Sequence, residues 1–323
     1  MDQERRSQLL AVKLAALVGG EAAPATVGDF GGGAALLLHD RAWVLLDHQP
    51  ERGLGGALAW ALRQQAASLT VLADTATGLL ARRAAGFGFP IEVRHVQGHT
   101  HVPAVAEPLP ISAPVPPEHR ELAATITLGG ATPVEEHGVL VGEVSGLEVC
   151  RVVTDVHTGA VRLDVGIGAD DREMFQMLHG DRPTIEALAD VVQFVGAQRV
   201  PGAPRHPLNL LAQERLLRAH LAAHPELLGA RQVAIAAPPV PRRNLKDPVP
   251  CVAVADIEGR SVAVVCSSGV DLDLVPYAVD ACTSLGLAEC RIVVPTRDAL
   301  PIQHRIAACA AAAITVVGID AVA

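Results

Sequence analysis

Apolar residues recur along the first hundred positions at spacings that alternate between those of helices and those of strands. Residues 2–18 carry apolar side chains at helical spacing after a charged start, which predicts a helix that ends at Gly19-Gly20. Two apolar runs, 34–38 and 43–46, flank the polar turn His39–Arg41 and predict a hairpin of buried strands. The pattern continues with a helix at 54–66, a strand at 69–73, a helix at 76–86 and a strand at 91–96.

The last third of the chain repeats this order of elements. The expected elements are a helix at 208–222, strands at 250–256 and 261–266, a helix at 272–284, a strand at 291–295, a helix at 299–312 and a strand at 314–318. The spacing from Trp43 to Val71 nearly equals that from Ala263 to Ile292. We therefore predict two similar units that arose by internal duplication. The alternative is that unrelated α/β units share such spacings.

The region between these two ends is predicted to form a small β-β-α unit. Its expected strands are 139–144, 147–153 and 160–165, followed by helices at 170–178 and 184–198. Prolines are concentrated in 103–117, where their fixed φ and missing N–H indicate an extended linker. The predicted fold class is thus α/β, with two similar mixed-sheet units flanking the middle region. The predicted domains are an α/β unit at 1–102, a Pro-rich linker at 103–133, the middle region at 134–205 and an α/β unit at 206–323.

Composition narrows the class of protein. Half of the 323 residues are hydrophobic, which excludes wholesale disorder. The net charge of −9 argues against non-specific nucleic-acid binding, although a local Arg-rich face remains compatible with it. The six cysteines form no C-x-x-C pair, as expected for reduced thiols in the cytoplasm. The chain opens without a signal peptide and has no apolar run of about 18–20 residues, so we expect a cytoplasmic protein without a membrane partner.

Several motifs near the C-terminal hairpin occur together. A helix carrying Glu214–Arg218 precedes His224–Leu228, and the hairpin at 250–266 turns through an acidic glycine loop. This arrangement resembles the RecB-like branch of the restriction-endonuclease-like, or PD-(D/E)XK, superfamily. The resemblance implies a nuclease-like mixed sheet, and a Mg²⁺ site formed by an Asp on the first hairpin strand and Glu-x-Lys on the second.

The chain departs from the family pattern where catalysis requires carboxylates. Counted without gaps across the turn, the positions of the family's Asp, Glu and Lys are occupied here by Cys251, Val265 and Ser267. The N-terminal hairpin leads into Asp47–Gln49 and also lacks Glu-x-Lys. A resemblance with this degenerate site implies a non-catalytic binding or regulatory component in nucleic-acid transactions, with nucleic acid or a protein as partner. The stretches Gly142–Val149 and Asn244–Pro248 also resemble proteins of GC-rich Gram-positive bacteria, which implies no particular function.

The middle region supplies the carboxylates for an alternative function. Strand alternation across its second hairpin predicts that Glu148 and Cys150 share a face with Arg162 and Asp164, while Asp171 begins the next helix. Carboxylate oxygens are the preferred ligands of Mg²⁺ and Mn²⁺. Glu148, Asp164 and Asp171 are therefore candidate ligands of a metal-dependent hydrolase or nuclease. The other interpretation is a solvated sheet face with a Glu148–Arg162 cross-strand pair.

Two further segments could bind ligands. Gly53, Gly55 and Gly56 lie between a strand and a helix, where glycine loops cradle phosphates, so a nucleotide or small-molecule sensor is a second alternative. The loop lacks the full G-x-G-x-x-G spacing, which also allows a purely structural turn.

Arg242, Arg243 and Lys246 form the densest basic stretch after the N-terminus and are candidate contacts for nucleic acid or a protein partner. A solubilising connector is the other interpretation of this stretch. The valine-rich strands are also compatible with a homodimer.

Overall fold

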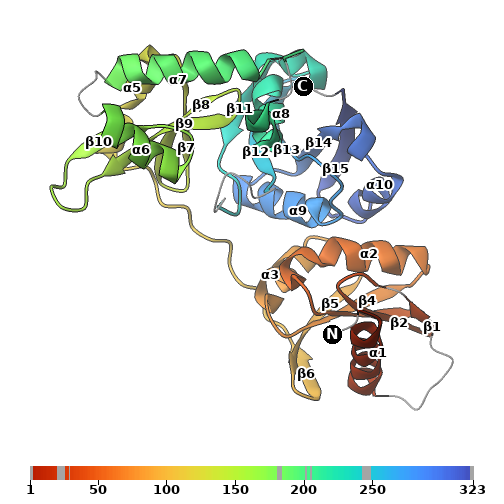
Figure 1. The fold of residues 1–323 in the computed structure, drawn as a ribbon. Coiled ribbons are helices and arrows are strands. Elements are labelled where there is room, and N and C mark those ends of the chain that lie inside the picture. Colours follow the sequence, from red (N-terminus) through yellow and green to blue (C-terminus); the bar gives the residue numbers. More distant parts are fainter. Residues whose placement is uncertain are drawn as a thin grey trace. The chain divides into compact units, whose positions relative to one another are not determined.

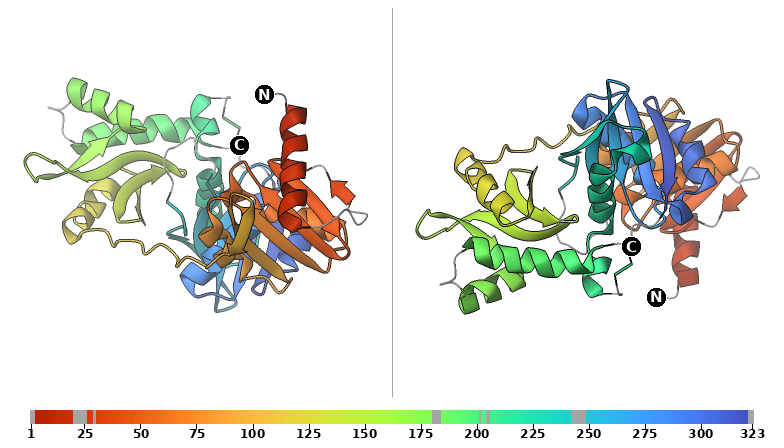
Figure 2. Two further views of the ribbon diagram at one scale, coloured as in Figure 1. Left: turned by 90° about the horizontal axis from the view of Figure 1, so that it is seen from below. Right: turned by 90° about the horizontal axis from the view of Figure 1, so that it is seen from above.

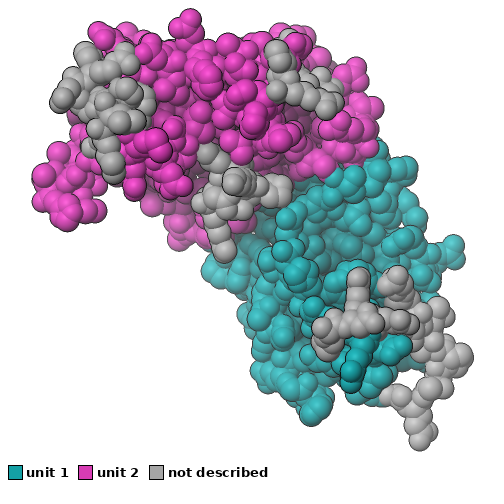
Figure 3. Space-filling model, viewed as in Figure 1, with its two compact units in different colours: residues 1–109, 270–292, 299–316 teal, residues 110–269, 293–298, 317–323 magenta. Residues whose placement is uncertain are grey.

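The structure, a computed structural model, describes residues 3–19, 26–28, 30–179, 184–200, 202–203, 206–241 and 249–320. Its described residues form three sheets accompanied by helices, which confirms the predicted α/β class (Figure 1). The chain divides into two compact units, coloured separately in Figure 3. The first unit contains residues 1–109, 270–292 and 299–316, and the second contains 110–269, 293–298 and 317–323.

The N-terminal sheet has six strands in the order β1-β2-β3-β4-β5-β6. Its strands are β1 (Thr26–Gly28), β2 (Gly33–Leu38), β3 (Arg41–Leu46), β4 (Ser68–Ala73), β5 (Ile91–Gln97) and β6 (Thr100–Pro103). The first three form an antiparallel meander, β3, β4 and β5 run parallel, and β6 returns antiparallel to β5. Helices α2 (Leu54–Arg63) and α3 (Thr77–Ala84) make the parallel crossovers. Helix α1 (Gln3–Val18) packs across β2 and β3 through Leu14 and Leu17 (Figure 2).

The C-terminal sheet has five strands in the order β11-β12-β13-β14-β15. Its strands are β11 (Gln232–Ala236), β12 (Cys251–Ile257), β13 (Arg260–Cys266), β14 (Glu289–Pro295) and β15 (Ala313–Ile319). Helix α8 (Gln213–Ala223) precedes an antiparallel meander of β11, β12 and β13. Helices α9 (Leu274–Leu285) and α10 (Pro301–Ala307) then precede β14 and β15. The element order of the N-terminal sheet, from α1 to β5, therefore recurs here.

The middle sheet is antiparallel, with the strand order β10-β9-β8-β7. Its strands are β7 (Thr132–Glu136), β8 (Val139–Val144), β9 (Leu147–Thr154) and β10 (Val161–Val165). Helices α5 (Ala123–Leu128) and α7 (Thr184–Gln198) pack on its core through Ile126, Leu188 and Val195. Helix α4 (Pro117–Arg120) precedes α5, and α6 (Ala169–His179) contacts β10.

Tight turns with left-handed residues set the register of three hairpins. His137-Gly138, Ser145-Gly146 and Glu258-Gly259 each have positive φ at both positions. This conformation matches the twist of a two-residue hairpin turn, and glycine at its second position adopts it without strain.

The segment 103–133, predicted as a linker, contains α4, α5 and the start of β7 as well as extended chain. Proline is compatible with α4, because Pro117 begins that helix, where a missing N–H costs no helical hydrogen bond. The compact units also group residues 270–292 and 299–316 with residues 1–109, whereas the sequence pattern places them in a unit at 206–323.

Candidate functional site

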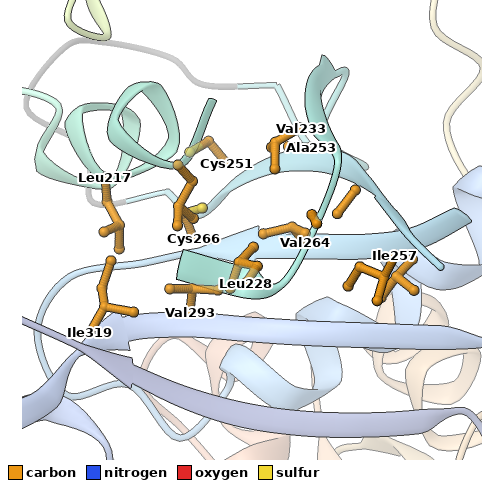
Figure 4. Close-up of a cluster of buried hydrophobic side chains, with 14 residues drawn as sticks. Leu217, Leu228, Val233, Cys251, Ala253, Ile257, Val264, Cys266, Val293 and Ile319 are labelled. Atoms are coloured by element: carbon orange, nitrogen blue, oxygen red, sulfur yellow. The ribbon is translucent and has the colours of Figure 1, made fainter. Parts of the chain in front are cut away.

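The hairpin β12–β13 holds buried, uncharged side chains where the nuclease resemblance requires a metal site. Cys251, Val265 and Ser267 are at most 4% exposed. Cys251 pairs with Cys266, so Val265, one residue earlier on β13, points to the opposite face. In Figure 4, Cys251 and Cys266 lie near Leu217 of α8 in a hydrophobic cluster. These positions therefore neither converge nor carry a metal-binding carboxylate.

The strands of the two hairpins contain a single acid. Strands β2 and β3 have none, and in β12 and β13 the one acid is Asp256, near the turn. Its carboxylate accepts the Gly259 N–H at 3.0 Å and the Nε–H of Arg231 at 2.9 Å. Asp256 therefore stabilises the turn and neutralises an exposed arginine.

Glu148, the first candidate metal ligand, is held between two arginines. Its Oε1 accepts from Arg151 Nε and from Arg172 Nη1, both at 2.8 Å, and its Oε2 accepts from Arg151 Nη2 at 2.9 Å. The residue is 7% exposed. Two arginine side chains thus pair with this buried carboxyl group.

The other two candidate ligands have separate partners. Asp164 accepts from Arg162 Nε at 2.8 Å, and Asp171 accepts the backbone N–H of Ile167 at 2.6 Å. Across the described ranges, no group of three or more His, Cys, Asp or Glu side chains is arranged to hold a metal ion. Glu148, Asp164 and Asp171 are therefore not brought together as a three-carboxylate group.

A β-bulge decides which side chains share the face of Glu148. Strand β8 pairs Glu143 with Glu148 and Gly142 with Cys150, which leaves Val149 as the extra residue. Val149 and Cys150 are both fully buried in the core. The prediction that Cys150 shares a face with Glu148 is therefore wrong, because the bulge shifts the alternation by one residue.

Gly53 precedes α2, while Gly55 and Gly56 lie in its first turn, and all three are closely packed within the first unit. A Cβ on Gly55 would lie 1.9 Å from the carbonyl oxygen of Leu272. The Gly55 N–H donates to Asp273 Oδ1 at 3.0 Å, so an oxygen of the chain's own Asp273 occupies the place at the start of the helix where a phosphate oxygen would bind. The Cβ of a residue at Gly53 or Gly56 would face Leu46 or Phe30, respectively. These contacts give the glycines a packing role.

Asp273 belongs to a buried ionic cluster that the sequence pattern did not reveal. Arg83 pairs with Asp273 and, through Nε at 2.8 Å, with Asp280. Arg82 pairs with the other oxygen of Asp280 at 2.9 Å. Burial raises the pKa of Asp273 to about 7, against the lowering effects of Arg83 and the Gly55 N–H. No local motif predicts this cluster, because its arginines and aspartates are far apart in the sequence.

A second buried cluster joins α8 to the middle sheet within the second unit. Arg218, which is fully buried, contacts Glu136 at 2.7 Å and Glu143 at 3.1 Å. Arg215 pairs with the same two carboxylates. Two arginines thus balance two glutamates away from water. Arg218 Nε is buried without a hydrogen-bond partner.

The stretch Gly142–Val149, which the sequence analysis noted, contacts α8 beside this cluster. Glu143 supplies a carboxylate, and a Cβ on Gly146 would lie 2.2 Å from the carbonyl oxygen of Arg215. Arg199 Nε donates to the carbonyl oxygen of Ser145 at 3.1 Å, and its Nη atoms donate to the chain just before α8. The stretch therefore has an architectural role.

The remaining candidates, Arg242, Arg243 and Lys246, lie outside the described residues. Within the part of the chain that is described, no helix has both the length and the apolar character needed to cross a bilayer. Comparison of the chain with known protein families, curated proteins and solved structures gave no match.

Proposed function

We propose that the chain is a non-catalytic protein with a nuclease-like fold that acts as a binding or regulatory component in nucleic-acid transactions. The observation that carries the proposal is the hairpin β12–β13, where the positions that the resemblance assigns to a metal site, Cys251, Val265 and Ser267, are buried and carry no carboxylate. An antiparallel meander followed by helix and strand accompanies them, as the resemblance implies.

The proposal includes an internal duplication, supported by a reciprocal contact within the first unit. After α3, the Gly88 N–H donates to the carbonyl oxygen of Cys309 at 2.8 Å. After α10, the Ala311 N–H donates to the carbonyl oxygen of Gly86 at 2.9 Å. Phe87 forms an isolated antiparallel bridge with Ala310 between these bonds. Helices α3 and α10 hold the same place in the repeated element order, so each segment meets the other through corresponding groups.

Fluorescence anisotropy with labelled single- and double-stranded DNA and RNA tests the binding function. We expect binding that weakens as salt rises, because phosphate neutralisation releases counterions. The variant Arg242→Ala/Arg243→Ala/Lys246→Ala should weaken it. The matched control Arg5→Ala/Arg231→Ala/Arg297→Ala removes the same charge from other exposed sites and should bind nearly normally. An absence of binding at low salt would contradict the proposal.

The same samples test the alternative of a metal-dependent hydrolase. If Mn²⁺ induces cleavage of the labelled strands, the variant Glu148→Gln/Asp164→Asn distinguishes the sites. Loss of cleavage in this variant would move the function to the acidic residues of the middle region. A nucleotide that co-purifies with the protein would favour the sensor alternative.

A further inference from the structure

Strand β15 differs from every other edge strand in the three described sheets. Exposed edges present unpaired N–H and C=O groups, and proteins protect them with short strands, prolines and charges. Strands β1 and β6 have three and four residues, and β6 ends in Pro103. Strand β7 carries Pro133 and two glutamates, and β10 carries Arg162 and Asp164. Strand β11 has five residues and contacts β7.

By contrast, β15 has seven residues, Ala-Ile-Thr-Val-Val-Gly-Ile, without a proline or a charge. It pairs with β14 on one side and ends the described sheet on the other. The Ala313 N–H donates to the carbonyl oxygen of Ala288, just before β14, so it points toward that strand. Because backbone groups alternate, those of Ile314, Val316 and Gly318 point to the outer edge.

The N-terminal sheet indicates what kind of segment fits this edge. Strand β5 holds the same place in its sheet as β15, and β6 covers its outer side in antiparallel register. The described part of the C-terminal sheet has no strand that corresponds to β6. The fold thus already accommodates an antiparallel strand at this position.

We propose that β15 pairs antiparallel with β15 of a second copy of this chain, so that the two C-terminal sheets join around a two-fold axis. A strand that meets its own copy forms a self-complementary interface. Residues 313–319 are uncharged, so no register of this pairing opposes like charges within the strand. Thr315 is exposed, so a substitution there changes the edge strand without entering the core. The pairing does not depend on the proposed function.

Sedimentation velocity over a range of protein concentrations tests the pairing, using the full chain. We expect a reversible monomer–dimer equilibrium. Thr315→Lys places a charge on the edge and should raise the dimer Kd about tenfold or more. Thr100→Lys makes the same change at an exposed position of β6 and should leave the Kd unchanged. A wild-type chain that stays monomeric at its highest soluble concentration, or a dimer that Thr315→Lys does not weaken, would overturn the proposal.

Hydrogen exchange locates the interface independently of any substitution. Peptides that cover β15 should exchange more slowly at high than at low protein concentration, because the outward amides of Ile314, Val316 and Gly318 become hydrogen-bonded. Thr315→Lys should abolish this difference. A dimer without added protection in β15 would place the interface elsewhere and contradict the pairing. Neither measurement involves nucleic acid, so its outcome is separate from that of the binding assay.

Discussion

Replacing Arg218 by methionine tests whether the buried cluster of the second unit is balanced as described. The wild-type cluster has two arginines and two glutamates, so Arg218→Met leaves one carboxylate charge uncompensated away from water. Breaking a buried ion pair from one side typically costs about 3–5 kcal/mol. With a urea m value of about 3 kcal/mol/M for a chain of this size, the unfolding midpoint should fall by about 1–2 M.

Urea denaturation followed by far-UV circular dichroism measures this shift. Arg231→Met makes the same change in an exposed ion pair, where Arg231 is 83% exposed, and should move the midpoint little. Adding Glu143→Gln to Arg218→Met removes the excess charge, so the double variant should be more stable than the single one. A double variant that is less stable than Arg218→Met would refute the charge-balance explanation.

Three further expectations concern other parts of the structure. Asp273 has a pKa of about 7 in the folded protein and its ordinary pKa of 3.8 in the unfolded chain. Its contribution to stability is therefore present at low pH and declines as the pH rises between these two values. The urea midpoint of Asp273→Asn should accordingly vary less than that of the wild type between pH 5 and pH 8. Gly55→Ala should lower the urea midpoint strongly, because the added Cβ would overlap the carbonyl oxygen of Leu272. Gly31→Ala is the control and should have little effect, because no atom lies within 4 Å of the Cβ added there. Equal midpoints for the two variants would contradict the packing role of Gly55. Iodoacetamide treatment of the native protein, followed by mass spectrometry, should find Cys309 modified first, because it is the least buried of the cysteines. Cys150 should stay unmodified, because burial raises its pKa to about 12. Rapid labelling of Cys150 would argue against its placement in the core.

Much of the secondary structure follows from local pattern. The hairpin at 34–46 and the strands at 250–256 and 261–266 are confirmed as β2, β3, β12 and β13, because apolar runs around polar turns are a strong strand signal. Strands β1, β6, β7 and β11 were not predicted. They are edge strands of three to five residues, and β7 contains a proline and two glutamates, so none of them gives a long apolar run.

The side-chain clusters could not be predicted, because they depend on long-range placement. The bulge at Val149 reverses the faces expected for Cys150, and one extra residue leaves no local mark in the sequence. The partners of Arg83 and Arg218 lie on other elements, far along the chain. The glycines at 53–56 were interpreted from their place before a helix, but the carboxylate that meets Gly55 belongs to Asp273.

Cleavage of nucleic acid under single-turnover conditions tests most directly whether the chain is non-catalytic. Labelled single- and double-stranded DNA and RNA would be incubated with excess protein and Mn²⁺ and resolved on denaturing gels. We expect strands that remain intact under conditions where anisotropy detects salt-sensitive binding, because Cys251, Val265 and Ser267 carry none of the carboxylates that a Mg²⁺ or Mn²⁺ site needs. Mn²⁺-dependent cleavage that co-purifies with the protein and disappears in a point variant would contradict this proposal.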